Sequence, residues 1–385
     1  MAVEGLDSIN FNHVLNSIEF SLEPPSRAEI AKQVGLSRTA VSYIVQKLIA
    51  MELVMEQEKE NDGKPGRPGT PLVLNPNVWH SIGASFYSCE WCFVSVNLLG
   101  AIQSTYCLQV KDNSQQEILG ALLEGLKYMK ANSQPKLLPA FGVGAPGLVD
   151  ARKGTIERAD DLGWNNTILL SDLIRKSTGL DSFILNRYCA NGIEEIEKKQ
   201  YTKRFENIVY LGMGTAMAGT VFLGGKFVEN TKYRLGHIVI DPNGERCHCG
   251  QEGCLQTMVC EQAWIRKAEA LGLQGIRSGQ DISQLAENGN ELARRCIQEI
   301  AKPLSMGLAI IVNVLNPDLI ILGGPLGSSS QYLLDTVREL MKSRILDYQY
   351  EHITMVKGDA GKYSSAVGAA LLPLKQKYEL LNKAQ

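Results

Sequence analysis

Four potential metal ligands within eighteen residues, one imidazole and three thiols, constrain this chain more than any other feature of its sequence. The segment starts at Gly236-His237 and ends in Cys247-His248-Cys249-Gly250-Gln251-Glu252-Gly253-Cys254. Its glycines allow a turn tight enough to return the third sulfur to the other two. A Cys3His set suits tetrahedral zinc and leaves no coordination position open for a reactive water. The sequence therefore predicts a structural zinc site with four ligands, His237, Cys247, Cys249 and Cys254.

Disulfides or unreactive buried thiols are the alternatives for this cluster. The chain has nine cysteines, an odd number, and shows no N-terminal signal segment, so we expect a reducing, cytoplasmic location. Cys89 and Cys92 form a Cys-x-x-Cys pair, but residues 88–94 have the pattern of a strand, in which alternate side chains face opposite sides. A redox role for that pair is therefore disfavoured. The cysteines expected to be small core residues are Cys89, Cys92, Cys107, Cys189, Cys260 and Cys296.

Length and charge set broad limits on the chain. At 385 residues it is long enough for two or three domains with substantial cores. Its net charge of −2 gives no sign of a polyanionic partner, so any nucleic-acid contact must come from a local basic surface. No uninterrupted apolar run is long enough to cross a bilayer, and we expect no membrane partner.

The N-terminal region shows three short helical patterns separated by turn signals. The first, about residues 10–20, is apolar on one face. A capping box at Ser26-Arg27-Ala28-Glu29 opens a second helix that Gly35 ends. Ser37 caps a third helix over residues 38–50. Two helices joined by a short glycine-containing turn predict a helix-turn-helix, whose second helix reaches base edges in DNA.

The third helix carries the exposed polar residues that we expect to contact DNA. Between Glu29 and Glu52 the sequence holds three basic residues and no acidic one, so the local surface is positive although residues 1–70 as a whole are not. The alternative is a plain helical hairpin that packs on a partner protein. The predicted DNA contacts of this helix are Ser37, Arg38, Thr39, Ser42, Tyr43 and Lys47.

Two strand patterns follow, Leu53–Glu56 and Pro71–Leu74, on either side of a segment rich in glycine and proline. This arrangement is typical of a wing, whose Gly-Arg-Pro tip is narrow enough for Arg67 to enter a minor groove. A solvated linker arginine is the alternative for Arg67. A helix-turn-helix followed by a wing indicates a DNA-binding domain more specifically than either feature alone. The sequence therefore predicts a winged helix-turn-helix DNA-binding domain over residues 1–75.

From Val78 onward, strand and helix patterns alternate, and glycine turns follow several of the strands. These motifs are Phe141-Gly142-Val143-Gly144-Ala145-Pro146-Gly147, Asp161-Leu162-Gly163-Trp164, Ile184-Leu185-Asn186-Arg187, the glycine-rich hairpin over 211–219, and the strand and turn over 319–325. Taken together with the zinc cluster, they resemble the ROK family of bacterial sugar kinases and sugar-responsive repressors. The resemblance covers residues 78–372, and the winged helix ahead of it matches the repressor branch.

The resemblance implies the fold class and the domain order. The expected fold is α/β, with the winged helix-turn-helix followed by a two-lobed actin-like (ribonuclease H-like) sugar-kinase-type body that carries a structural zinc loop. The first lobe is expected over residues 76–187 and the second over 188–385, with the C-terminal helices returning to the first lobe. The family holds sugar in the cleft between the lobes. Its members form homodimers or homotetramers, which suits a two-fold operator.

Two positions that serve phosphate transfer in the family's kinases have lost their acids here. The kinases open with an Asp-x-Gly-x-Thr turn, where this chain has Ser81-Ile82-Gly83-Ala84-Ser85. Their Asn-Asp pair, whose Asp deprotonates the sugar hydroxyl, is Asn186-Arg187 here. An arginine keeps its proton at any relevant pH and cannot act as that base. We therefore expect a body without kinase activity.

The resemblance also implies an effector pocket, in which His237 binds zinc through one ring nitrogen and ligand through the other. Arg187 and Arg234, which replace family acids, could clamp an anionic sugar phosphate or sugar acid, because a guanidinium pairs well with both. Alternatively, the arginines pair with internal acids (Asp161, Glu194 or Glu195) and the pocket has decayed. The predicted effector contacts are Gly144, Asp161, Asn186, Arg187, Arg234, His237 and Gln256.

These features together predict a transcriptional regulator that responds to a sugar or sugar derivative, and specifically a repressor of carbohydrate-utilisation genes. Its expected partners are operator DNA, a small effector and further copies of itself. Two alternatives are an active ATP-dependent carbohydrate kinase with a regulatory DNA-binding head, and an architectural DNA-binding dimer whose pocket binds nothing.

Overall fold

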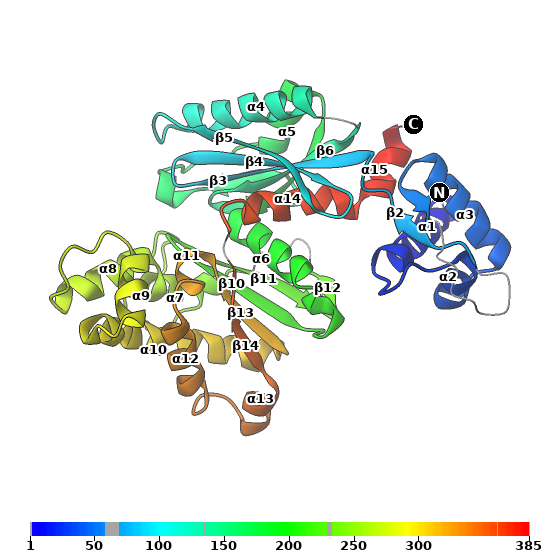
Figure 1. Cartoon of the computed structure of the whole chain (residues 1–385). Helices are drawn as coiled ribbons and strands as arrows, with labels where there is room; N and C mark the ends of the chain where they lie inside the picture. Colours follow the sequence, from blue (N-terminus) through cyan, green and yellow to red (C-terminus); the bar gives the residue numbers. More distant parts are fainter. Residues whose placement is uncertain (1, 58–68, 134–135, 229–232, 360, 385) are drawn as a thin grey trace.

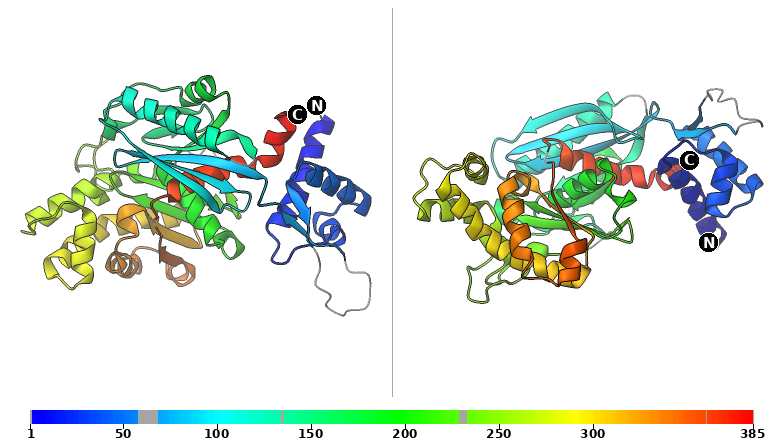
Figure 2. Two further views of the ribbon diagram at one scale, coloured as in Figure 1. Left: turned by 45° about the horizontal axis from the view of Figure 1, so that its top comes forward. Right: turned by 60° about the horizontal axis from the view of Figure 1, so that its bottom comes forward.

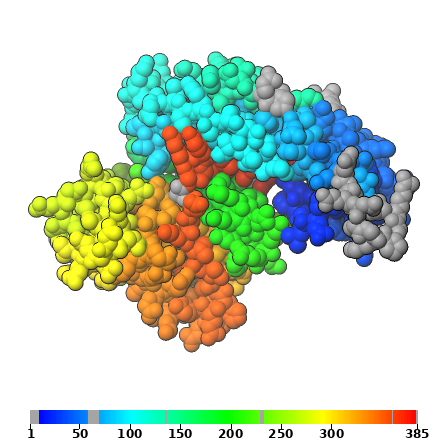
Figure 3. All heavy atoms as spheres, in the orientation of Figure 1, coloured from blue at the N-terminus to red at the C-terminus, as the bar shows by residue number. Residues whose placement is uncertain are grey.

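A computed structural model of the chain describes residues 2–57, 69–133, 136–228, 233–359 and 361–384. A small helical domain comes first, and two α/β lobes follow it (Figure 1). The small domain lies at one end of the molecule beside the first lobe, away from the outermost helices of the second lobe (Figure 3).

The N-terminal domain is a winged helix-turn-helix, as the sequence predicts. Its helices are α1 (Ala2–Glu19), α2 (Arg27–Val34) and α3 (Arg38–Ala50), and its strands β1 (Val54–Glu56) and β2 (Leu72–Leu74) pair antiparallel. Ser26 and Glu29 form the expected capping box, and Gly35 ends α2 at a φ of 70°. Helix α1 begins well before residue 10, where the sequence analysis began it, because no proline or turn cluster interrupts the preceding residues.

The first lobe is built on a five-stranded sheet in the order β5-β4-β3-β6-β9. The strands are β3 (Trp79–Tyr87), β4 (Glu90–Asn97), β5 (Ile102–Gln109), β6 (Lys136–Ala145) and β9 (Asp181–Asn186). The first three form an antiparallel meander, and β6 and β9 run parallel to β3. Helices α4 (Gln115–Asn132) and α5 (Leu170–Thr178) contact this sheet, and a small hairpin of β7 (Leu148–Asp150) and β8 (Thr155–Arg158) leaves the end of β6.

The second lobe repeats this strand plan with the order β12-β11-β10-β13-β14. Its strands are β10 (Ile208–Met213), β11 (Met217–Leu223), β12 (Lys226–Phe227), β13 (Leu319–Gly323) and β14 (Thr354–Lys357). Its helices are α7 (Leu255–Val259), α8 (Glu261–Ala270), α9 (Gly279–Glu287), α10 (Glu291–Leu315), α11 (Gly324–Gly327), α12 (Gln331–Met341) and α13 (Asp347–His352). The repeated plan gives the molecule the expected two-lobed sugar-kinase-type body.

Two helices lie between the sheets of the two lobes. Helix α14 (Ser364–Lys375) packs on β3 and β6 of the first lobe and on α6 (Arg187–Lys198), which in turn packs on β10 and β11 (Figure 1). The backbones approach so closely that side chains do not fit. A Cβ on Gly83 would lie 1.9 Å from the Ala366 carbonyl oxygen, and one on Gly368 would lie 1.8 Å from that of Ala190. Any side chain at either position would force the layers apart.

The last helix, α15 (Lys377–Ala384), returns to the DNA-binding domain and contacts α1. Both views in Figure 2 show it beside the winged helix. The rings of Phe11 and Tyr378 stack with centroids 4.5 Å apart, and the buried ammonium of Lys377 pairs with Glu19 at 2.5 Å. One hydrophobic cluster runs from the winged helix through the first lobe to α15. The DNA-binding domain is therefore packed against the body.

Among the described residues, α10 is the one helix that is long and apolar enough to cross a membrane. About half of its apolar stretch, 56%, is buried inside the second lobe. Burial in that lobe accounts for its composition, as in the core helix of a globular protein.

Candidate zinc cluster, effector cavity and DNA-binding surface

The four residues that the sequence predicts as zinc ligands lie together in the second lobe. Their ligand atoms all fall within 4.8 Å of one another. The sulfurs of Cys249 and Cys254 are 3.6 Å apart, and Cys247 Sγ is 3.6 Å from His237 Nδ1. These separations match the edges of a tetrahedron around zinc with metal–ligand bonds of about 2.0–2.3 Å. The donor set therefore fits a closed, structural zinc site.

The local backbone explains how the ligands converge. Gly250 and Gly253 adopt positive φ values of 95° and 68°, and a Cβ on Gly253 would lie 1.5 Å from the Asp241 carbonyl oxygen. Gln256 donates a hydrogen bond from Nε2 to Cys247 Sγ at 3.1 Å, which helps to orient this sulfur within the cluster. Because His237 faces the sulfurs through Nδ1, its Nε2 points away from them. Burial, and next the charge of Arg234, lower the pKa of His237, which keeps the ring neutral for metal binding.

A cavity of about 480 Å³ opens beside the cluster between the two lobes. Its size suits a monosaccharide or a small derivative. Of the seven predicted effector contacts, six line it. The six lining residues are Asp161, Asn186, Arg187, Arg234, His237 and Gln256.

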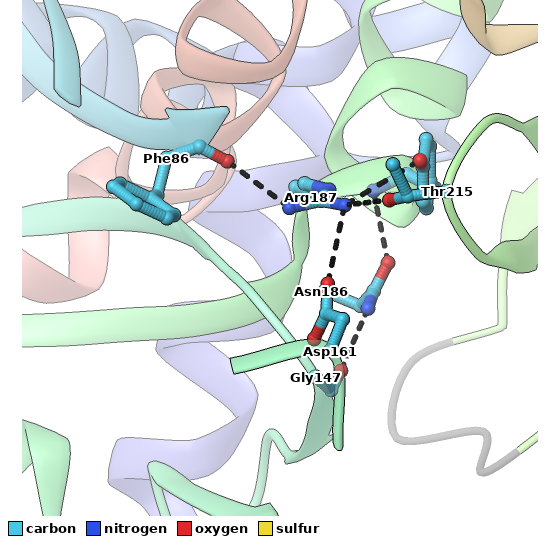
Figure 4. Close-up of polar contacts among 7 residues, drawn as sticks. Phe86, Gly147, Asp161, Asn186, Arg187 and Thr215 are labelled. Carbon is cyan, nitrogen blue, oxygen red and sulfur yellow. Dashed lines mark hydrogen bonds and ion pairs between the residues drawn. The ribbon is translucent and has the colours of Figure 1, made fainter. Parts of the chain in front are cut away.

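Arg187 is held by the protein at the wall of this cavity (Figure 4). Its side chain is only 8% exposed, and it donates to Thr215 Oγ1 at 2.9 Å and to the Phe86 carbonyl at 3.5 Å. Asp161 Oδ2 lies 3.7 Å from Nη2. Burial opposes the charge, but Tyr188 and Asp161 outweigh it and raise the pKa of Arg187. This guanidinium is a permanent cation with several partners already in place.

Asn186 also has its polar atoms engaged. Its Nδ2 donates to the Gly147 carbonyl at 2.8 Å, and its Oδ1 accepts from Tyr188 N at 2.9 Å, which caps the start of α6 (Figure 4). These bonds fix the junction between β9 and α6, where Arg187 begins the helix. Asn186 therefore has a structural role in addition to its place at the cavity.

Arg234 differs from Arg187 in its surroundings. It lies just before His237 at the cavity wall and is exposed. Within the described part of the chain, no carboxylate pairs with its guanidinium, whereas Arg158, another lining residue, pairs with Asp160 at 2.7 Å. Glu194 and Glu195, the other candidate partners, lie elsewhere: Glu194 faces Lys198 at 3.5 Å, and Glu195 accepts from Asp359 N. Among the described arginines that line the cavity, Arg234 is thus the one without a carboxylate partner.

The predicted DNA-contacting residues of α3 lie at its start and along one side. Arg38, Thr39 and Tyr43 are exposed, and Ser37 caps the helix through a bond from Ala40 N. Ser42 is half-buried. Lys47 lies over the rings of Tyr43 and Phe11, at 4.9 and 5.6 Å, so its ammonium is turned toward α1. Arg67, at the predicted wing tip, falls outside the described residues.

Comparison with known proteins matches both parts of the chain. A model described as the ROK family covers residues 96–376, nearly three quarters of the chain. The chain belongs to the ROK family. A model described as a winged helix DNA-binding domain covers residues 12–67, which places this ROK protein among the family's transcriptional regulators.

Curated relatives and solved structures agree with that placement. The xylose repressor of Caldicellulosiruptor bescii is 26% identical over 85% of this chain and 86% of its own length. The DNA-binding transcriptional repressor Mlc of Escherichia coli is 24% identical over 91% of this chain and 89% of its own. A crystal structure of a ROK family transcriptional regulator, a homolog of E. coli Mlc, superposes with a TM-score of 0.84 and 25% identity, covering 98% of each chain.

The body of this ROK protein also has the fold of sugar kinases. A ROK family glucokinase from Streptomyces griseus, solved with glucose and AMPPNP, superposes with a TM-score of 0.66 and 23% identity. It covers 76% of this chain and 98% of the glucokinase, so the winged helix is the additional part.

The cavity lining of this ROK protein differs in several residues from the predicted set of effector contacts. Gly144 does not line the cavity, because it lies inside β6, where a Cβ would meet Ser85 and Arg187; Gly147 lines the cavity in its place. Other lining residues were not predicted: some, such as Arg158 and Gln262, lie outside the sequence motifs, while Thr215 and His248 lie inside two of them, where no local signal shows that they face the cavity. The missed polar residues include Arg158, Thr215, Tyr233, His248 and Gln262.

The Cys-x-x-Cys segment is likewise different from the expected continuous strand. Ser88 and Cys89 have φ values of 49° and 60° and form the turn between β3 and β4. Positive φ at both positions is typical of a two-residue hairpin turn. Cys89 is therefore exposed, not a core residue, while Cys92 points into the fold.

Proposed function

We propose that this ROK protein is a transcriptional repressor of carbohydrate-utilisation genes, released by a sugar derivative and without kinase activity. Arg187 carries the proposal: it occupies the position where the resemblance puts the kinase's catalytic carboxylate, and it is a buried cation. A guanidinium cannot take a proton from a sugar hydroxyl. The winged helix and the repressors among the relatives support the regulatory role.

We further propose that the effector is anionic, a sugar phosphate or a sugar acid. The sequence suggested that Arg187 and Arg234 both bind the ligand. Arg187 already has Thr215 and Asp161 as partners, so we assign the main contact with the anion to Arg234. Arg234 offers an unengaged fork of donors beside His237. A phosphate or carboxylate matches such a fork in charge and geometry.

Calorimetry on the zinc-loaded full chain tests this proposal. The titrants are neutral hexoses and pentoses, their phosphates, and the matching uronic acids. We expect micromolar binding of at least one anionic sugar, about tenfold or more above its neutral parent. Arg234→Gln is expected to remove that preference, while Arg295→Gln, an exposed arginine on α10, keeps it. Tight binding of an unmodified neutral sugar would refute the anionic effector but not the repressor.

The coupling route that we propose runs through α14 and α15. Helix α14 packs on the first lobe and on α6, which carries Arg187. Helix α15 continues from it to α1, where Tyr378 stacks on Phe11, and Phe11 lies under Lys47 of α3. Closure of the lobes around an effector would thereby change the position of the winged helix. An effector acts in this way only through its different affinity for the two arrangements.

Three experiments test the proposed repressor, and the first two separate it from its alternatives. An ATP-turnover assay with a panel of sugars is expected to show no phosphorylation; turnover would favour the kinase. A thermal-shift screen is expected to find a sugar derivative that raises the melting temperature, which an architectural protein with an unused cavity would not show. Light scattering after size exclusion is expected to give a homodimer or homotetramer, as a two-fold operator requires.

A further inference from the structure

Two cysteines outside the zinc cluster lie directly opposite each other on neighbouring strands. Cys92 of β4 pairs with Cys107 of β5, and their sulfurs are 3.0 Å apart. Three positions away, at the ends of the same two strands, Val110 N donates to the Cys89 carbonyl, so Cys89 and Val110 form a hydrogen-bonded pair. Because pair types alternate along an antiparallel ladder, Cys92 and Cys107 form a non-hydrogen-bonded pair, the type whose Cα atoms are closer, at about 4.5 Å. A disulfide fits within that separation.

A metal ion is the competing explanation for this cluster, because the Glu90 carboxylate lies 3.2 Å from Cys92 Sγ. Two observations oppose it. Glu90 is already paired with Lys362, whose Nζ is 3.0 Å away. In addition, a sulfur separation of 3.0 Å is shorter than the edge of a tetrahedron with Zn–S bonds of about 2.3 Å. The zinc cluster of this same chain shows 3.6 Å between Cys249 and Cys254.

The two thiols differ in their access to solvent. Strand β5 is the edge of its sheet, and Cys107 is half-buried, whereas Cys92 is buried. Burial raises the pKa of Cys92 well above its ordinary value, so this thiol stays protonated. An oxidant therefore meets Cys107 first, with Cys92 in place as the resolving thiol.

We propose that Cys92 and Cys107 form a reversible disulfide, a redox-modification site on the first lobe, with a hydroperoxide as the oxidant. Cys107 loses its proton, and its thiolate attacks one peroxide oxygen. The O–O bond breaks, and Cys107 becomes a sulfenic acid. The hydroxide that leaves hydrogen peroxide takes up the proton from Cys107 and forms the first water. The Cys92 sulfur then attacks the Cys107 sulfur, and the S–O bond breaks. The Cys92 proton leaves with the hydroxyl group as water. In total, two thiols are oxidised and one peroxide is reduced to two waters. A dithiol reductase reverses the reaction.

The site lies against the segment that joins the two lobes. Lys362 and Tyr363 directly precede α14, and they contact Glu90 and, at 3.9 Å, Cys107 Sγ. Disulfides in reducing compartments are typically transient and redox-sensing. The proposed site thus gives this protein an input that is independent of the effector cavity.

Peptide mass spectrometry on the zinc-loaded full chain tests the disulfide. The chain is treated with stoichiometric hydrogen peroxide, its free thiols are alkylated, and it is digested with trypsin. Cys89, Cys92 and Cys107 fall in one tryptic peptide ending at Lys111, because Lys64 and Arg67 precede prolines. We expect this peptide to lose about 2 Da and to carry one alkyl group instead of three, and dithiothreitol to reverse both changes.

Serine variants identify the partners. Cys89→Ser is the matched control and is expected to keep the oxidation, whereas Cys92→Ser and Cys107→Ser abolish it. Circular dichroism confirms that each variant folds. If Cys89→Ser abolishes the oxidation and Cys107→Ser keeps it, the pair is Cys89–Cys92 and the proposal is wrong. Protection from alkylation that EDTA removes without a mass change indicates a metal and also overturns it, as does a wild-type peptide with no mass loss.

Discussion

At the scale of single residues, the arginines that line the cavity of this ROK protein differ in burial and in their partners. Arg187 and Arg234 both replace acids that the resemblance leads one to expect, yet one is buried with partners and the other is exposed. The same residue type therefore occurs in two environments, as a buried cation with protein partners at Arg187 and as an exposed cation, proposed to contact the effector, at Arg234. Local surroundings decide between them, because a buried guanidinium must be paired.

The structural role of Arg187 predicts a loss of stability on its replacement. Arg187→Met keeps much of the volume but leaves Thr215 and Asp161 without their donor. We expect the free energy of unfolding to fall by about 1–3 kcal/mol in urea titrations. Arg295→Met, at an exposed position, should stay within about 0.5 kcal/mol of the wild type. Equal stability of the two variants would mean that the Arg187 contacts are energetically neutral.

Operator binding should depend on Arg38, which is exposed at the start of α3. Arg38→Ala is expected to weaken binding by about 1 kcal/mol or more. If Arg38 contacts a phosphate, the slope of log affinity against log salt should also fall by about 1. Fluorescence anisotropy at several salt concentrations measures both, with Arg295→Ala as the control. An unchanged affinity would count against the assignment of α3 as the recognition helix.

At the scale of elements, one segment shapes the cavity and another joins the body to the DNA-binding domain. The zinc loop presents His237 at one end and, through Cys247, holds Gln256. Helix α15 connects the body to α1 through a stacked aromatic pair and a buried ion pair. Each of these contacts involves only a few side chains, so each can be tested by one substitution.

Loss of the metal should disturb the cavity as well as the loop. Cys249→Ser, at a half-buried ligand position, is expected to lose bound zinc and the response of operator binding to effector together. Elemental analysis and operator-release assays measure the two effects. His248→Ser, at the exposed residue between two ligands, is the neighbouring control for zinc content. Full effector response in a zinc-free protein would show that the loop does not shape the cavity.

The contact between α15 and α1 should carry the effector signal. Lys377 is 3% exposed and pairs with Glu19, and Glu19→Gln keeps the shape of that contact but removes one charge. We expect the ratio of operator affinities without and with effector to fall several-fold, because coupling energies are typically about 1–3 kcal/mol. Effector affinity itself, measured by calorimetry without DNA, should change less than the ratio. A preserved ratio would place the coupling elsewhere.

At the scale of the whole molecule, the DNA-binding domain and the first lobe share one hydrophobic cluster. Trp79 Nε1 also donates to the Met51 carbonyl at 2.8 Å, next to an ion pair between Lys136 and Glu52. A domain packed in this way cannot move freely as a tethered head. The proposed coupling of the body to the winged helix would therefore act through this packed interface.

This packing predicts that the winged helix unfolds together with the first lobe. Native-state hydrogen exchange should give helices α2 and α3 protection similar to that of β3 and β4. Trp79→Phe, which loses the bond to Met51, is expected to lower the protection of the winged helix selectively. Exchange of the winged helix at its own, much faster rate in the wild type would contradict the shared core.

Much of this architecture could be predicted from sequence because its signals are local. Capping at Ser26 and Ser37, the turn at Gly35, and the zinc ligands all lie within short stretches whose geometry depends on neighbouring residues. The features that the sequence did not predict are contacts between residues far apart in the chain and a short turn without glycine or proline. The sequence pattern made Cys89 part of a strand, but a two-residue turn interrupts it, and the partner of Cys92 lies fifteen residues further on, across the sheet.

The sequence by itself determined the family, the winged helix, the His/Cys cluster that fits zinc, and the arginine at position 187, because each depends on residue identity and short spacing. The tertiary structure alone decided how those residues are used. It placed Asp161 and Thr215 around Arg187, left Arg234 exposed, and joined α15 to α1. These contacts link residues far apart in the chain, so no local pattern encodes them. They arise when two sheets and the helices between them pack as one body.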